Sequence, residues 1–548
     1  MLELGHYQYS SWVAVGVIIY MIIMVLIGFF SVKYIKDSSD YIVAGRRLPF
    51  FMLLGAIVAT WYGAGPIMGA AANSYLYGFQ GIIFEPLSSA LCLLLAGIFF
   101  VRLMRRAEYT TVGDIFHVRY GKIMGLCSLI ILVIVEIGWV GSQLVAFGSI
   151  LRVFTGWSMG AGIMMSCFVL VLYTYLGGMW AVTITDVFQF IILVIVLLIA
   201  FPVIITYMGG WEIFTKAGNF SDFPTWALYP IRGEGYLGYS GLTGWVYYIA
   251  AWLSIGVGSL CAQDLMQRVL AGKNEKVIVR ACYAGAIIYI TIGMIGPLLG
   301  LATFASNPHL TIADTELIIP WIGVKYLPPI LTVLFVIAIL AILMSSATGA
   351  ILAASSLIGY NFLKIVKPLS IDRTMLLLTR TMVPVICFIA LVLALWLQTI
   401  YKLMVIAWTV LLVGLMASFI AAFFWEKANH IGALSSFVAG FLSWIIITFC
   451  YLPMTKVANI GVAEASKVYM DWAIWDAVYI SSTWAFLISI MTLIIVSLLT
   501  QKIDPPKILL DAHGNPLGIK NWCGSLSVKK YLPFLNNSTF QNRRKKCR

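Results

Sequence analysis

Long apolar stretches, separated by shorter polar ones, run through almost the whole of this sequence. A helix needs about 20 apolar residues to cross a hydrocarbon core of about 30 Å, and these stretches are too long and continuous for the strands of a membrane barrel. The pattern therefore predicts an all-α integral membrane protein with about thirteen transmembrane helices. The expected spans are residues 12–31, 50–74, 79–101, 124–151, 158–176, 182–207, 243–262, 280–303, 327–358, 379–398, 403–424, 431–453 and 478–499.

Composition supports this interpretation and excludes a soluble globule of this size. Of 548 residues, 61% are hydrophobic and only 10% are charged, and the mean hydropathy is +0.97. The segment before the first span lacks a basic start and no small-residue cleavage site follows that span, so we expect a retained helix and not a signal peptide. The five histidines have no nucleophile–base or metal spacing, and a phosphate-binding loop is missing, so neither an enzyme nor a nucleotide-driven pump is expected.

The distribution of Lys and Arg predicts the orientation of the chain. The connections after alternate spans, beginning with the first, hold 28 of the 35 basic residues. Because basic residues gather in cytoplasmic loops, we expect a multi-pass protein of the plasma (inner) membrane with its N-terminus outside and its C-terminus in the cytoplasm. Topology then explains the net charge of +13, with the lipid bilayer as a partner and no need for nucleic acid. The basic tail is either solvated or attracted to anionic lipid.

The segment 59–69 interrupts the second expected span. Gly63, Gly65 and Pro66 together indicate a mid-membrane break, which frees backbone carbonyls and amides to face a cavity. Freed carbonyls can coordinate a cation. The alternative is simple packing, because small residues let membrane helices approach closely and Gly65 and Gly69 have the small-xxx-small spacing.

Spans two to six and seven to eleven form two blocks of five with opposite starting orientation, which permits an inverted repeat. The first span of each block carries an interruption, at 59–69 and at 254–264. The expected layout is an extra N-terminal helix with a cytoplasmic loop, a first repeat, an extracellular loop, a second repeat, two additional helices and a basic cytoplasmic tail. These units are residues 1–49, 50–207, 208–242, 243–424, 425–500 and 501–548.

Hydroxyl and carboxyl groups inside the spans are candidate ion ligands. Ser345 and Ser346 can supply oxygen atoms to a small hard cation, although serine in a membrane helix often bonds its own backbone or a neighbouring helix. Ionisable residues at the bilayer centre cost about 2.5–3.5 kcal/mol each on insertion scales, which draws attention to Glu85, Glu136 and Asp186. Asp186 follows a glycine turn, so it is either a cation ligand or gate, or the cap of a helix.

Five segments in order carry a resemblance to a known family: residues 59–69, 110–122, 173–189, 263–274 and 343–346. Through them the chain resembles the sodium:solute symporter family, which includes sodium-coupled glucose, proline and choline transporters. The resemblance implies a LeuT-like core of two inverted five-helix repeats, alternating access around a central site, and a co-transported sodium ion.

The resemblance also implies which residues form the sodium sites. A second sodium site or gate would use Asp186 and Thr348, but Gly349 stands where such a site would have another hydroxyl, so one sodium ion is expected and not two. The main site would use oxygen atoms of Ala59, Tyr62, Ile342, Ser345 and Ser346.

Within the family the choline transporter branch is the most similar, and it implies a solute site. A quaternary ammonium is recognised by aromatic faces, and Trp61 and Trp139 match two rings of such a cage, although both can instead be belt or packing residues. Gln143 and Gln263 are the other solute candidates, and the third ring expected beside Gln263 is Ala262 here. We therefore expect sodium-coupled import of a choline-like cation, with an amino acid, a monocarboxylate or a vitamin as alternative solutes. An uncoupled channel or membrane sensor on the same fold is the alternative class.

Overall fold

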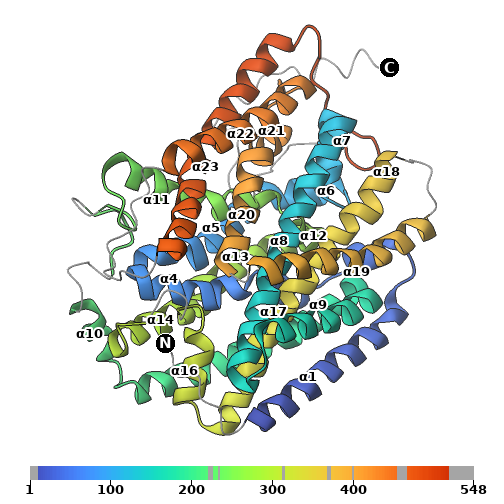
Figure 1. The fold of residues 1–548 in the computed structure, drawn as a ribbon. Coiled ribbons are helices and arrows are strands. Elements are labelled where there is room, and N and C mark those ends of the chain that lie inside the picture. The colour runs from blue at the N-terminus through green and yellow to red at the C-terminus, as the bar shows by residue number, and fades with distance from the viewer. Residues whose placement is uncertain are drawn as a thin grey trace.

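The computed structural model describes residues 10–219, 226–231, 235–310, 315–366, 372–397, 400–452 and 466–517, which are helices joined by turns and a few isolated β-bridges (Figure 1). In chain order the helices are α1 (Ser10–Ser31), α2 (Ser38–Val43), α3 (Phe50–Trp61), α4 (Ala70–Tyr77), α5 (Ser88–Leu95), α6 (Val101–Ala107), α7 (Gly113–Tyr120), α8 (Lys122–Thr155), α9 (Met159–Tyr207), α10 (Ile213–Asn219), α11 (Gly241–Gly256), α12 (Gln263–Ala271), α13 (Glu275–Thr291), α14 (Ile295–Ser306), α16 (Ile318–Tyr326), α17 (Pro329–Ser356), α18 (Leu363–Val366), α19 (Asp372–Leu397), α20 (Ile400–Leu411), α21 (Ala417–Phe424), α22 (His430–Tyr451) and α23 (Ser466–Thr500).

The predicted multi-span helical architecture is confirmed. Within the described ranges, eleven helical runs are long and apolar enough to cross a membrane, and two shorter apolar helices, Phe50–Trp61 and Met159–Leu172, lie where the sequence predicts further spans. The second predicted span is divided between α3 and a run that begins at Gly65 and continues through the third predicted span to Ala107. The basic end of the predicted tail, residues 518–548, lies outside the described residues.

α17 lies at the centre of the fold. It packs against α8, α9 and α3, and all of its residues from 338 to 356 are buried. A helix that is apolar and buried all round belongs to the interior of a bundle. α1 packs on α9 at the edge of the bundle, and α22 and α23 pair with each other on the opposite side (Figure 1).

Both predicted interruptions are real breaks in the helices. α3 ends at Trp61, and a π-turn at Gly65–Gly69 leads into α4. α11 ends at Gly256, and a short 3-10 turn at Gly258–Cys261 precedes α12. Each break therefore places two helix ends inside the bundle, where the backbone is no longer fully bonded within one helix.

α9 joins the fifth and sixth predicted spans into one long element with a kink at Gly178. The φ angle of this residue is +52°, in the region that favours glycine. The predicted glycine turn is thus a kink within α9. Asp186 lies eight residues beyond it, inside the helix, so the interpretation of Asp186 as a helix cap is wrong.

Candidate functional site

The break after α3 exposes backbone groups that bond to other helices. In an unbroken helix the carbonyl of Ala59 would accept the amide of residue 63, whereas here it accepts the hydroxyl of Ser346 at 3.2 Å. The amide of Ala64 donates to Oε1 of Gln143 at 2.9 Å. Pro66 adds no amide donor of its own. The break is therefore tied to α17 on one side and to α8 on the other.

Gly63 is required at the point where these two bonds converge. A Cβ atom added to it would lie 2.5 Å from Oε1 of Gln143 and 2.6 Å from Oγ of Ser346. Contacts this short would force the side-chain ends of Gln143 and Ser346, both buried, to move away, which would break the two bonds. The absence of a side chain at this position is what lets α8 and α17 reach the freed backbone.

Of the residues implied for the main sodium site, Ala59 and Ser346 are in contact at this junction, whereas the hydroxyl of Ser345 bonds Asp186. Ser346 contacts Ala59 directly, and Ile342 lies one turn before Ser346 on α17. Tyr62 follows α3 with a non-helical ψ of 59°, and its hydroxyl donates to the carbonyl of Ile292 at 3.0 Å, so only its backbone oxygen is left for the break. Freed carbonyls and hydroxyls of this kind are suitable ligands for sodium.

Of the residues implied for a second sodium site, Asp186 bonds the neighbouring helix, whereas Thr348 bonds only its own helix. Ser345 donates its hydroxyl to Oδ1 of Asp186 at 2.5 Å, which joins α17 to α9. Thr348 turns its hydroxyl back to its own helix, donating to the carbonyls of Met344 and Ser345 at 2.9 and 3.0 Å. Asp186 and Ser345 therefore form one contact, and Thr348 is not part of it.

Three tryptophan rings are in contact beside the break. Trp61 and Trp408 have ring centroids 5.8 Å apart at 64°, and Trp139 and Trp408 have centroids 5.3 Å apart at 60°. All three are buried, and edge-to-face contacts of this kind are favourable. Trp408 comes from α20, not from the segment beside Ala262 where the sequence predicts a third ring. Trp408 lies in the predicted span 403–424, and no local signal in that span marks it as the third ring.

A fourth buried acid, Asp264, completes this region. Its Oδ2 accepts the indole N–H of Trp61 at 2.8 Å, and its amide donates to Oε1 of Glu136 at 3.1 Å. Asp264 lies in the first turn of α12, where the helix dipole favours a negative charge. Asp264 lies just outside the predicted span 243–262 and is not among the predicted ion ligands. The sequence feature that points to Asp264 is an acidic residue directly after an interrupted helix.

The two glutamines predicted to contact solute lie in different places. Gln143 bonds the break at Ala64. Gln263 accepts the amide of Val112 at 2.8 Å, which joins α12 to the turn before α7. The structure thus brings together Trp61 and Trp139 through Trp408, and it sets Gln263 on a separate contact.

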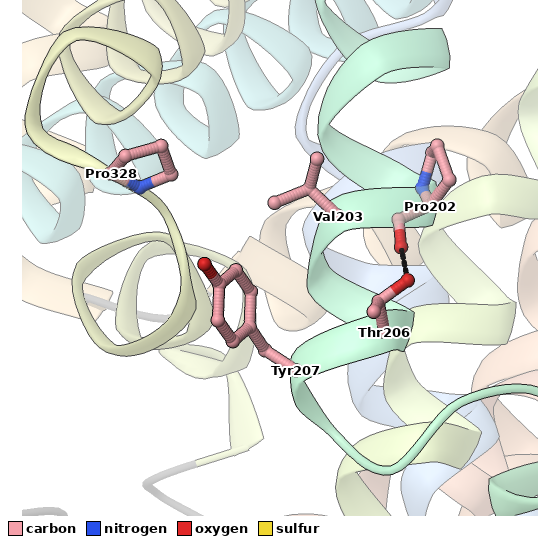
Figure 2. Close-up of a pocket in the computed structure, with 5 residues that line it drawn as sticks. All are labelled: Pro202, Val203, Thr206, Tyr207 and Pro328. Atoms are coloured by element: carbon pink, nitrogen blue, oxygen red, sulfur yellow. Dashed lines mark hydrogen bonds between the residues drawn. The ribbon is translucent and has the colours of Figure 1, made fainter.

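A shallow surface pocket of about 430 Å³ lies elsewhere, between the end of α9 and the start of α17 (Figure 2). Its lining is largely apolar, and Thr206 uses its hydroxyl to bond the carbonyl of Pro202 at 2.8 Å. Tyr207 on its rim is mostly exposed. None of the candidate ion or solute residues lines this pocket, which is formed by Pro202, Val203, Thr206, Tyr207 and Pro328.

Known proteins are similar to this chain in sequence and in fold. Residues 41–440 match the sequence model of the family described as "Sodium:solute symporter family". A high affinity choline transporter 1 of Homo sapiens is 26% identical over 446 residues, covering 78% of this chain and 75% of that protein. A sodium/proline symporter of Staphylococcus aureus is 25% identical over 510 residues, covering 88% of this chain and 92% of that protein.

Among solved structures, the substrate-bound outward-open state of a Na+-coupled sialic acid symporter matches with a TM-score of 0.70 at 21% identity. The match covers 90% of this chain and 98% of that chain. At this identity the likeness is one of fold, and it extends over nearly all of the helices described above.

Proposed function

The chain belongs to the sodium:solute symporter family, and from this membership we propose that it imports a choline-like organic cation together with sodium. Membership makes it a sodium-coupled symporter with a LeuT-like fold, and not an enzyme. The solute, the ion ligands and the orientation are the parts that we propose.

The observation that carries the proposal is the hydrogen bond from Ser346 to the carbonyl of Ala59. It brings a hydroxyl of α17 against a carbonyl freed by the break of α3. A sodium ion between these elements would take both oxygens as ligands, together with oxygens of Tyr62, Ile342 and Ser345. Carbonyls of unwound helices coordinate sodium in transporters of this architecture.

Sodium bound there would hold α3 against α17. A ligand shifts a conformational equilibrium only by its difference in affinity for the two states, so an ion shared between two elements favours the state in which they are close. Bound sodium then raises the affinity for solute, and bound solute raises the affinity for sodium by the same factor. In the proposed layout, the repeats at 50–207 and 243–424 provide the two sides that move.

The tryptophan cluster is our basis for the solute class. An ammonium group over an aromatic face gains about 0.5–2 kcal/mol, and Trp61, Trp139 and Trp408 bring three aromatic rings together, packed edge to face. Asp264, which bonds Trp61, and Glu136, which bonds Asp264, add two buried carboxyl groups to this region. Their acceptor oxygens favour a cation over a monocarboxylate, and the choline transporter relative is consistent with this solute class.

We also propose that the N-terminus is outside and the C-terminus cytoplasmic, in the plasma (inner) membrane. The support is the concentration of basic residues on the alternate connections, 28 of 35. Cysteine labelling on either side of the membrane, at Lys33 and at Lys507, would test this, because the proposal places both in the cytoplasm.

Uptake into proteoliposomes tests the transport proposal. Radiolabelled choline, proline and lactate are offered with an inward sodium or potassium gradient, to the natural protein and to the S345A S346A double variant. We expect choline to accumulate with sodium only, and the double variant to lose this accumulation. Accumulation of proline or lactate instead would overturn the solute class but not the symport. Sodium-independent flux without accumulation would favour a channel.

A further inference from the structure

Arg268 is a fully buried cation whose guanidinium group is only partly bonded. Its Nη1 donates to the backbone carbonyl of Asp264 at 3.1 Å, while Nε and Nη2 have no hydrogen-bond partner. Among the described residues it has no ion pair of 4.0 Å or less. A guanidinium without a close counter-charge is unfavourable in the interior, so its surroundings must balance it at longer range.

Three buried carboxylates provide that balance. Glu136 on α8, Asp186 on α9 and Asp264 on α12 all interact electrostatically with Arg268. Asp186 differs from the other two in its bonding, because Oδ1 accepts the hydroxyl of Ser345 and Oδ2 has no partner. An acid with a free oxygen next to a hydroxyl is a candidate ligand for a cation, and the cation already present in this region is Arg268.

The guanidinium group of Arg268 packs directly against Gly349. This residue lies one turn after Ser345 and therefore on the same side of α17. A Cβ atom added to Gly349 would lie 2.4 Å from Nη2 and 3.1 Å from Cζ of Arg268. The guanidinium thus occupies the space that a side chain at 349 would need, on the face of α17 that bonds Asp186.

We propose that Arg268 is a built-in cation for Asp186, so that Asp186 binds no ion and transport is coupled to one sodium ion. That ion is the one held at Ala59 and Ser346, and the inference rests on the proposed sodium-coupled function. A sodium ion at Asp186 would meet the like charge of Arg268 in a medium of low polarity, where such repulsion is poorly screened. Thr348 does not assist a second ion, because its hydroxyl is directed to its own helix.

Counting sodium ions bound to the purified full-length protein tests this. Equilibrium dialysis with radioactive sodium, without solute, gives the number of ions per chain. We expect one ion for the natural protein and one for R268K, which keeps the charge. We expect two for R268Q, because Asp186 then lacks its cation, and one for the charge-neutral pair D186N R268Q.

The outcomes separate the two proposals. Two ions in the natural protein, reduced to one by D186N, would overturn the role of Arg268 and leave sodium coupling intact. One ion in both the natural protein and a folded R268Q variant would also overturn it. If R268Q does not fold, R268M is the second variant: it also removes the charge but keeps an extended side chain, and it should bind two ions, whereas one ion in folded R268M would overturn the role of Arg268. No bound sodium in the natural protein would instead overturn the proposed sodium site, and the role of Arg268 with it.

Discussion

Trp61 donates its indole N–H to the carboxylate of Asp264 at 2.8 Å, and this bond joins the end of α3 to the first turn of α12. The two residues belong to the two interrupted segments of the molecule. Gln263, the neighbour of Asp264, accepts the amide of Val112 before α7. A displacement of Trp61 by solute would therefore act on α12, which also contacts the turn before α7.

Replacing Asp264 by Ala should weaken solute binding by releasing Trp61. A hydrogen bond to a charged group contributes about 1.5–3 kcal/mol, so we expect the half-saturating solute concentration to rise about tenfold or more. Asp264→Asn keeps an oxygen acceptor for the indole and should have a smaller effect. Uptake kinetics in proteoliposomes measure both. Equal effects of the two substitutions would show that the charge matters and the bond to Trp61 does not.

The break at 59–69 could be predicted from the sequence because its signals are local. Gly63, Gly65 and Pro66 stand within four consecutive residues, and each acts on the backbone directly. The contact of Ser346 with Ala59 spans 287 positions and was accessible only through the family resemblance.

The third ring of the tryptophan cluster could not be predicted in the same way. Trp408 reaches Trp139 and Trp61 only because α20 packs against α8. Nothing in an apolar span reveals which neighbour its tryptophan faces. The partner of Asp264 was hidden for the same reason, since a bond between side chains 203 positions apart leaves no local pattern.

Gly63 and Gly69 form a matched pair for testing the break. Gly63→Ala should abolish most sodium-dependent uptake, because the new methyl group would lie 2.5 Å from Gln143 and 2.6 Å from Ser346. Gly69→Ala has room, since the nearest atom is 3.8 Å away, and should retain uptake near the natural level. Sodium titration of uptake measures both variants. Natural uptake in Gly63→Ala would contradict the junction of α3, α8 and α17.

Trp408 should matter for cationic solutes because it contacts both other rings. Trp408→Ala removes one aromatic ring and its packing contacts with Trp61 and Trp139. At about 0.5–2 kcal/mol per ring, we expect choline affinity to fall between about twofold and thirtyfold. Trp408→Phe should retain part of it. Trp396→Ala is the control, because Trp396 is 77% exposed on the outside of the bundle. Competition of choline uptake by unlabelled choline measures the affinity, and a loss equal to that of Trp396→Ala would exclude a role in the solute site.

Glu108 should make the docking of residues 509–517 sensitive to pH. Its carboxylate lies 3.0 Å from Nε2 of His513, and the amide of Ala512 donates to the carbonyl of Ala107 at 2.8 Å. The bond to His513 lowers the pKa of Glu108, with help from the positive charges of Arg46 and Arg105. A lowered pKa means that the folded structure favours the ionised form.

The stabilisation from Glu108 is therefore fully present above the unfolded carboxyl pKa of about 4.3, and it is lost as the pH falls through the lower folded value. Because the pair is exposed, its contribution is about 0.2–1 kcal/mol, so we expect local opening and not unfolding. Hydrogen exchange at the Ala512 amide, corrected for the intrinsic rate, measures it. Glu108→Gln should remove the part of the pH dependence due to this pair. Asp511, whose pKa is also lowered, mainly by the Asn515 amide, accounts for what remains, so an unchanged profile in Glu108→Gln would assign the whole effect to Asp511.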